Sequence, residues 1–307
     1  MGGSPNSSPV DLTYQKLCTR YTVRCMSHTM NGRSHMRVVC ITLPIAVVPI
    51  GLIAQATPPH SDWSVSIGSG AIVVPRYAGA EQYQVWPMPM SQVTYRDRVY
   101  LGPSTVGALG AGLGAYVVRS GALRMTAEVG LGANRPARRA DALAGMDDRD
   151  LLATAGASLT YDPGPVHGTI AWARGLNDHA GSITSARFGV TRLVAGHLMA
   201  TTDMVAVFAD ARQMRREFGI TDAEASSRRA LLSTGDRRLR PGEENAYRPN
   251  GGLSEVGASV ALAYGLRRRW SIVGFGGVSW LGDKAAGSPL VRRREQLTAG
   301  LGLAWRR

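Results

Sequence analysis

The stretch from Leu253 to Trp305 alternates with a period of two, and this alternation constrains the fold more than any other feature of the chain. Up to Leu266, one register holds Val, Ala, Leu and Tyr, while the other holds Glu, Gly, Ser and Ala. The run from Gln296 to Trp305 repeats the pattern, with Leu, Ala and Trp against Gln, Thr, Gly and Ala. Period-two alternation indicates β-strands, and each run has about the 9–11 residues that a tilted strand needs to cross a bilayer. The pattern therefore predicts membrane-spanning strands.

The character of the two faces favours a membrane barrel over a soluble β-sandwich, which is the alternative. A sandwich directs bulky residues inward and charged residues outward, whereas one face here is bulky and apolar and the other is mostly small. The chain has 37 glycines and only 4 phenylalanines in 307 residues, which suits a small-residue inner face better than a soluble core. We therefore expect an all-β fold, a transmembrane antiparallel β-barrel with its apolar side toward lipid.

Segments of alternating character, separated by turn chemistry, predict about twelve strands. Short turns such as Arg96–Arg98 and Asp162–Pro165 alternate with longer loops, so an outer-membrane barrel would place both termini in the periplasm. The weakest strand is expected at 99–104. Pro87 and Pro89 predict a bulge or a poorly paired section, because each removes a ladder donor. Aromatic residues near the expected strand ends indicate a girdle: Trp63, Tyr95, Tyr161, Tyr264, Trp270, Trp280 and Trp305.

Residues 36–56 carry the pattern of a secretory signal peptide. Arg37 supplies the positive start, the run Val38–Ile53 is apolar, and Ala54-Gln55-Ala56 fits a small-residue cleavage site. A transmembrane anchor is the alternative, but 16 apolar residues that include two prolines are short for one. We expect cleavage after Ala56.

The expected cleavage sets the remaining organisation of the chain. Residues 1–35 are polar and without periodicity, and we interpret them as an over-called N-terminal extension, with translation starting at Met36 or Met30. Residues 57–307 then form one outer-membrane β-barrel. All three cysteines precede residue 57, so the mature chain is expected to offer no thiol or disulfide chemistry.

The chain is basic, with a formal net charge of +13 and a pI of about 10.4. A nucleic-acid partner is one interpretation of such a charge. We expect none, because the basic residues are almost all arginine and are scattered over turns without an aromatic cluster or a basic helix. In the outer loops, arginine sets would lie near lipopolysaccharide phosphates, which guanidinium groups bind well, or would simply be solvated: Arg135, Arg138, Arg139, Arg215, Arg216, Arg228, Arg229 and Arg292 to Arg294.

No pattern in the mature chain predicts a catalytic, cofactor-binding or metal site, and we expect no enzyme. Ser158 and His167 both face inward in the expected register, but polar lumen residues are the ordinary explanation for them. Gly110–Gly114 lacks the spacing and the following helix of a nucleotide-binding fingerprint, so we interpret it as inward glycines of a strand. Three charged residues are expected in the lumen, where they pair, meet water or select solutes: Arg124, Glu128 and Glu255.

Four stretches carry short motifs in a fixed order: a Pro-x-Tyr-x-Gly turn in Gly70–Gly79, Pro-x-Pro in Trp86–Pro89, Phe-Gly-Ile-Thr in Glu217–Thr221, and Ser-Pro-Leu-Val at the end of Leu281–Val291. In this order they are similar to motifs of the MltA-interacting protein family, MipA/OmpV, of Gram-negative outer membranes. The resemblance runs from about residue 63 to residue 305. Two positions depart from it, because Glu217 stands where the family has tyrosine and Trp305 is followed by two arginines where the family ends on an aromatic residue.

The resemblance implies an outer-membrane scaffold that brings together a murein-degrading transglycosylase and a murein synthase through its periplasmic turns. The residues alone also allow a small-solute channel, because twelve strands lie between a self-filled barrel of eight and an open one of sixteen. The small-residue lumen would then be open or plugged, and the polar segment Gln213–Gly252 is long enough to fold inward. A surface adhesin using the long loops is the third alternative. The resemblance favours the scaffold.

Overall fold

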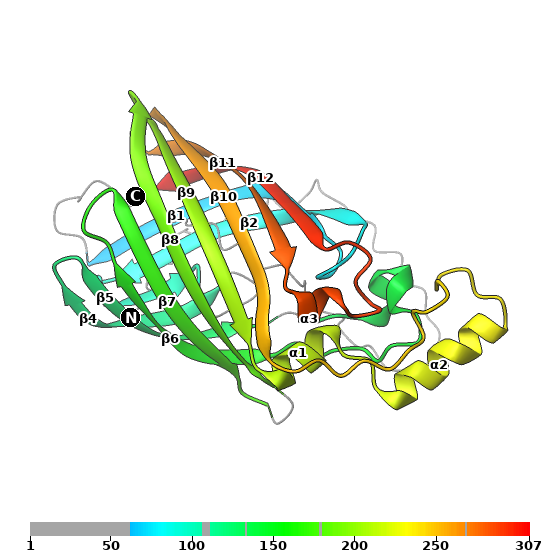
Figure 1. The fold of residues 1–307 in the computed structure, drawn as a ribbon. Helices are drawn as coiled ribbons and strands as arrows, with labels where there is room; N and C mark the ends of the chain where they lie inside the picture. Colours follow the sequence, from blue (N-terminus) through cyan, green and yellow to red (C-terminus); the bar gives the residue numbers. More distant parts are fainter. Residues whose placement is uncertain (1–61, 106–110, 133, 178–179, 268) are drawn as a thin grey trace, which may run out of the picture. The chain divides into compact units, whose positions relative to one another are not determined.

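Twelve antiparallel strands, each hydrogen-bonded to the next along the chain, close into a barrel when β12 pairs with β1 (Figure 1). The computed structural model describes residues 62–105, 111–132, 134–177, 180–267 and 269–307. The expected twelve-stranded antiparallel barrel is confirmed. The expected signal peptide and N-terminal extension lie outside the described residues. No helix in the described part of the chain is long and apolar enough to cross a membrane.

The wall is made of β1 (Trp63–Pro75), β2 (Tyr83–Tyr95), β3 (Val99–Gly102), β4 (Gly112–Ser120), β5 (Leu123–Leu131), β6 (Ala153–Tyr161), β7 (Val166–Gly175), β8 (Ser182–Ala195), β9 (Leu198–Ala209), β10 (Gly252–Arg267), β11 (Trp270–Leu281) and β12 (Glu295–Arg306). The connections hold η2 (Ala137–Arg139), η3 (Asp141–Leu143), α1 (Ala211–Phe218), α2 (Asp222–Ser233) and α3 (Asp283–Ala286). Connections leaving even-numbered strands are short and those leaving odd-numbered strands are mostly longer, as expected. The barrel thus has a short-turn end, where β1 begins and β12 ends, and a long-loop end.

The two registers of each strand face opposite sides of the wall, and β10 shows this clearly. Val260 and Tyr264 of its apolar register are 46% and 48% exposed, whereas Glu255 and Ala261 of the other register are buried. Because the side-chain period of a strand is two, a slip by one residue would exchange the two faces. The expected apolar outer face is therefore confirmed.

Large inward side chains lie over glycines of strands one or two positions away in the barrel. A Cβ atom added at Gly300 would collide with the ring of Phe275, and one added at Gly302 would collide with the Cε methyl of Met90. Glycine leaves room for a bulky cross-strand neighbour to lie against the backbone. The glycine-rich inner face is therefore not a smooth lining of small residues, because larger side chains from nearby strands occupy the space.

Pro87 and Pro89 lie in a strand that is fully paired on one side only. β2 pairs with β1 along its whole length without a register shift, so the expected bulge is wrong. Among the described residues, β2 pairs with the four-residue β3 only at Val93–Tyr95, so the expected poorly paired section is confirmed on that side. A missing N–H donor costs least on such an edge.

Side-chain caps begin the two helices that follow β9. Asp210 accepts a hydrogen bond from the Gln213 N–H at 2.8 Å and starts α1 directly after the end of β9. Thr221 and Glu224 form a reciprocal capping box that starts α2. Such caps satisfy N–H groups that have no partner inside the helix. The polar segment Gln213–Gly252 therefore contains most of α1 and all of α2.

Candidate functional site: a folded cap and a two-sided interior

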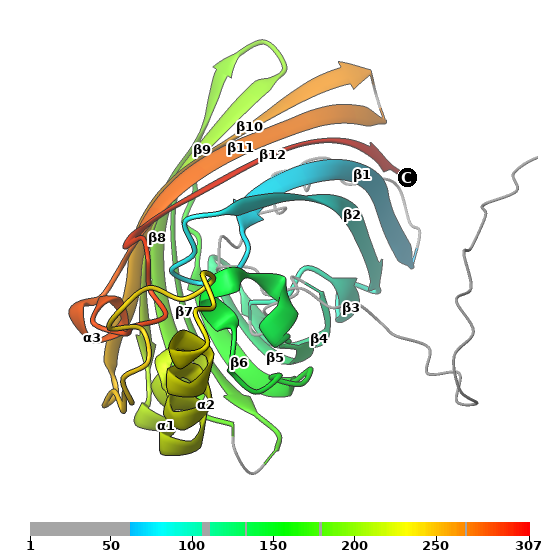
Figure 2. The same ribbon diagram turned by 90° about the vertical axis from the view of Figure 1, so that its right-hand side faces the viewer.

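Four connections at the long-loop end fold together into one body, which we call the cap: residues 76–82, 134–152, 210–251 and 282–294. Figure 2 views this end and shows the helical segments gathered in front of the strands. All four connections contribute to one buried apolar cluster, formed by Tyr77, Ala80, Ala142, Leu143, Met146, Ile220, Ala225 and Leu290. A second cluster joins α1 to α3 through Met214, Phe218 and Ala285. The cap therefore has its own hydrophobic core.

The segment Gln213–Gly252 is long enough to fold into the lumen, but its helices do not do so. α1 and α2 lie beyond the strand ends, at the long-loop end, rather than between the strands (Figure 1). Met214 and Phe218 of α1 are buried against residues of the neighbouring connection. The apolar residues of this segment thus become the core of the cap.

An ion-pair network ties three of the connections together. Arg292 Nε lies 2.7 Å from Glu243 Oε1, and Arg292 Nη1 lies 3.2 Å from Glu81 Oε1. Arg240 Nη2 lies 2.8 Å from Glu81. The hydrogen bond from Arg240 lowers the pKa of Glu81 below its usual value. Burial would raise the pKa of Glu243, but hydrogen bonds from Arg292 and from the Arg240 backbone outweigh it and leave the pKa lowered. Both carboxylates are therefore charged at neutral pH.

Arg228 of α2 joins two connections from inside the cap. Its side chain has no exposed surface, and its Nε donates to the Glu243 carbonyl oxygen at 2.7 Å. Its Nη1 donates to the carbonyl oxygens of Ala142 and Ala144, each at 2.9 Å. Buried carbonyl groups need such donors, because water does not reach them. The guanidinium of Arg228 therefore replaces water for three backbone groups that belong to two connections far apart in the sequence.

These burials correct the expectation that all the loop arginines face lipopolysaccharide. Arg135 and Arg228 are buried, and the Arg292 side chain is 9% exposed. Burial lowers the pKa of Arg135 and of Arg228. Arg215 and Arg229, by contrast, are exposed and remain available to an anionic surface.

The interior wall formed by β5 to β9 is polar. Glu128 on β5 accepts hydrogen bonds from Ser104 at 2.7 Å, Thr105 Oγ1 at 2.9 Å and Thr126 at 3.0 Å. Thr126 Oγ1 also lies 2.5 Å from Ser158 Oγ. The inward placement of Glu128 is confirmed, and the carboxylate is held by hydroxyl groups rather than by a cation.

The other two expected lumen charges have different surroundings. Glu255 is buried on the inner face near the long-loop end. Arg124 lies at the short-turn end, where its Nη2 is 2.8 Å from Asp162 Oδ2. Arg124 therefore links β5 to the turn between β6 and β7 and does not line the middle of the barrel.

Ser158 and His167 do not form a nucleophile–base pair. His167 Nε2 lies 2.9 Å from Asp203 Oδ1, and Arg187 Nη1 lies 3.7 Å from the other oxygen of Asp203. Ser158 belongs to the Glu128 group instead. Asp203 and Arg187 were not singled out from the sequence, although the period-two register that placed Glu128 inward also places them inward.

The opposite wall of the interior is apolar. Ile72 and Val74 of β1 are buried with Phe275 of β11 and pack against Trp86 and Met88 of β2. The interior therefore has an apolar side near β10 to β2 and a polar side near β5 to β9. Within the described part of the chain, no three His, Cys, Asp or Glu side chains group as metal ligands.

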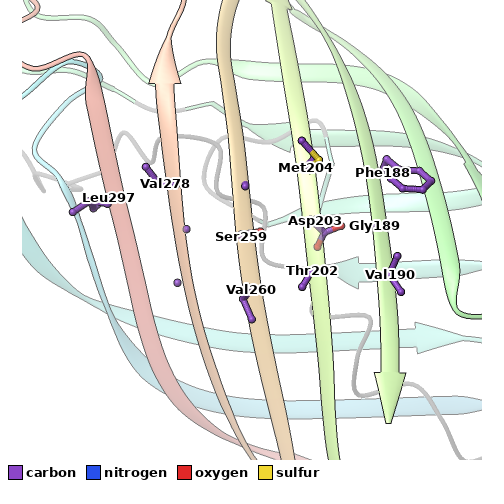
Figure 3. Close-up of a pocket in the computed structure, with 13 residues that line it drawn as sticks. Phe188, Gly189, Val190, Thr202, Asp203, Met204, Ser259, Val260, Val278 and Leu297 are labelled. Carbon is purple, nitrogen blue, oxygen red and sulfur yellow. The ribbon is translucent and has the colours of Figure 1, made fainter. Parts of the chain in front are cut away.

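The outer wall has a shallow apolar hollow of 590 Å³ across β8 to β12 (Figure 3). Most of its lining residues belong to the outward register, among them Phe188, Met204 and Leu297. Small outward residues, Ala258 and Gly276, form its floor. In a bilayer this wall meets lipid chains, so the hollow is part of the lipid-facing surface.

The closed sheet, its apolar outer face and its alternation of short turns with long loops define an outer-membrane β-barrel. The family described as MltA-interacting protein MipA matches residues 67–307. The chain belongs to this family, and its place is the outer membrane.

Comparisons with solved structures find distant likenesses to other outer-membrane proteins. An outer membrane channel from Pseudomonas putida F1 shares 8% identity with a TM-score of 0.40, covering 82% of this chain and 100% of that chain. OmpT of Vibrio cholerae shares 7% identity with a TM-score of 0.36, covering 80% of this chain and 97% of that chain. No curated protein matches the sequence. Likenesses at these values carry no argument about function.

Proposed function

We propose that this protein is a non-enzymatic scaffold that holds murein-remodelling enzymes at the outer membrane through its short-turn end. The family match over residues 67–307, to a family described by its interaction with MltA, is the observation that carries the proposal. The partners would be a murein-degrading transglycosylase and a murein synthase. Short turns face the periplasm in barrels of this kind, and the murein layer lies there.

Two features of the structure support a scaffold over a catalyst. The cap packs four connections into one core at the opposite end, which leaves the short turns as the surface available to periplasmic proteins. His167 is paired with Asp203 and Ser158 with Thr126, so neither forms the serine–histidine contact that nucleophilic catalysis needs.

Site-directed blocking would test which end binds the partner. Pro163→Cys places a thiol in the exposed turn after β6, and Ser233→Cys places one in the exposed part of the cap. Each protein is isolated from outer membranes, labelled with a bulky maleimide polymer and tested for capture of a purified murein transglycosylase. We expect the label at residue 163 to abolish capture and the label at residue 233 to leave it intact. The unsubstituted protein is the labelling control.

If the unlabelled protein does not capture the murein transglycosylase, the scaffold proposal is contradicted. Capture that is lost only with the label at residue 233 would place the partner on the cap instead.

A small-solute channel is the second candidate, because the interior has one polar wall with the Glu128 and His167–Asp203 groups. Single-channel conductance of the isolated protein in a planar bilayer separates the two. A steady open level would favour the channel and leave the scaffold as an added role. A folded, heat-modifiable barrel that never conducts would favour the scaffold.

A further inference from the structure

Arginine is in excess over acidic residues at the short-turn end of the barrel. Each of the three acidic residues there already pairs with an arginine: Asp62 with Arg96 at 3.1 Å, Asp97 with Arg119 at 3.9 Å, and Asp162 with Arg124 at 2.8 Å. The remaining arginines of this end have no carboxylate within ion-pair distance among the described residues: Arg98, Arg192, Arg267, Arg269, Arg306 and Arg307. An uncompensated positive field therefore remains at this end.

Four of these arginines are neighbours, and we call them the arginine corner: Arg267, Arg269, Arg306 and Arg307. The Arg306 N–H donates to the Arg269 carbonyl oxygen at 2.9 Å, which joins the β10–β11 turn to the end of β12. The Arg307 N–H donates to the Val65 carbonyl oxygen at 2.9 Å, which joins the same group to β1. These backbone contacts bring four positively charged residues to neighbouring strand ends, and a bound anion would offset their charge.

A row of aromatic side chains fixes the depth of the arginine corner relative to the membrane. In the strand register, Arg267 pairs with Trp270 after a register shift between Gly265 and Arg267. Trp270 pairs with Trp305, and Trp305 pairs with Ile67. Cross-strand partners share a face, and Trp270 and Ile67 are 43% and 55% exposed on the outer side. Tryptophan rings of membrane proteins lie at the level of the lipid headgroups. Arg267 is exposed and pairs with Trp270 at this level, so the arginine corner lies at headgroup depth.

We propose that the arginine corner binds the phosphate group of an anionic phospholipid in the leaflet at the short-turn end. Guanidinium groups match phosphate oxygens with two parallel hydrogen bonds, and clusters of four to eight basic residues beside a membrane span recognise anionic headgroups. Trp270 and Trp305 give the adjoining acyl chain an apolar contact. An acidic protein is the alternative ligand, but the aromatic row beside the corner points outward toward the bilayer, which favours a lipid. The proposal does not depend on the scaffold function.

Native mass spectrometry of the whole protein, isolated in detergent and mixed with single lipids, tests the proposal. The lipids are phosphatidylglycerol, which is anionic, and phosphatidylcholine, which is neutral overall. We expect phosphatidylglycerol to bind more tightly, and Arg267→Gln/Arg269→Gln to weaken it roughly 30-fold, since each arginine near a membrane surface contributes about a fivefold factor. The matched control, Arg212→Gln/Arg237→Gln, removes the same charge from exposed sites at the long-loop end and should bind like the parent.

A measurement on the parent protein covers the case in which the variant does not fold. Raising the salt concentration should weaken phosphatidylglycerol binding to the parent and leave phosphatidylcholine binding unchanged, because exposed charges are screened. Equal binding of the two lipids by the parent would overturn the proposal. Equal losses of phosphatidylglycerol binding in the corner variant and in the control variant would also overturn the proposal. Loss of capture of an acidic periplasmic protein by the corner variant, with phosphatidylglycerol binding unchanged, would assign the corner to a protein instead.

Discussion

The substitution Arg228→Met tests whether one buried guanidinium holds the cap together. Methionine fills most of the same space but cannot donate a hydrogen bond. It would leave the carbonyl groups of Ala142, Ala144 and Glu243, now served at 2.7–2.9 Å, without their donor in a site that water does not reach. It would also remove the positive charge that lies 3.9 Å from the Glu243 carboxylate.

The expected loss is large and local. Removing one member of a buried, hydrogen-bonded charge group costs about 3–5 kcal/mol, because its partners stay buried and unpaired. Since each 1.4 kcal/mol is a factor of ten, the opening equilibrium of the cap should shift roughly 100-fold to several thousand-fold. The strand ladders do not use Arg228, so the barrel wall should keep its stability.

Hydrogen exchange measured by mass spectrometry on the protein isolated in detergent resolves the two regions. Amides of residues 141–146 and 222–233 should exchange faster by that factor in Arg228→Met, while amides of β10 to β12 should not change. The control is Arg229→Met, because Arg229 is exposed on the same helix and its Nη2 donates only to Ser226 Oγ, at 3.0 Å. Unchanged exchange in the cap of Arg228→Met, or the same acceleration in Arg229→Met, would refute the role given to Arg228.

Three further predictions follow from other parts of the molecule. The folded-state pKa of Glu243 is lowered, so its contribution to cap stability should be present above the usual glutamate pKa of about 4.3. That contribution should be lost as the pH falls below this value. Hydrogen exchange of the cap amides that does not depend on pH between 6 and 3, after correction for the intrinsic exchange rate, would contradict this. Gly300→Ala should lower the free energy of unfolding by about 1–3 kcal/mol in urea titrations, because it displaces the Phe275 ring. In the control Gly276→Ala, the added methyl group meets only the Thr298 carbonyl oxygen at 3.9 Å, so the free energy of unfolding should fall less. Equal losses of unfolding free energy in the two variants would argue against the close packing at Gly300. Mass spectrometry of the isolated protein should find a chain that begins at Thr57, and a longer chain would contradict the expected signal peptide.

The residues of the interior show what the sequence pattern predicts and what it does not. The period of two placed Glu128 and Glu255 on the inner face, because facing is a local property of a strand. It could not supply the partners of Glu128. Ser104 comes from a connection and Thr126 from the same strand, and which residues meet depends on the register between strands. For the same reason Ser158 and His167, both inward, have different partners.

The connections also have some features that the local sequence predicts and others that only the tertiary structure shows. The capping box of Thr221 and Glu224 is a four-residue signal, so the start of α2 was readable from the sequence, although the polar composition of the segment concealed it. The clustering of four connections was not readable, because Arg228 bonds to carbonyl groups 84 and 86 residues away. Contacts of that kind exist only after the barrel has closed and brought the loops to one end.

The sequence by itself determined the barrel. Strand facing, turn position and the parity of the connections are set by neighbours a few residues apart, and the bilayer adds the requirement that every strand be paired and apolar outside. Tertiary structure decided the cap, the two-sided interior and the arginine corner. Arg267 and Arg306 lie 39 positions apart in the sequence, and only the pairing of β11 with β12 makes them neighbours. The pattern of charges along the chain does not predict that these residues are neighbours, because the closure of the sheet decides which strand ends meet.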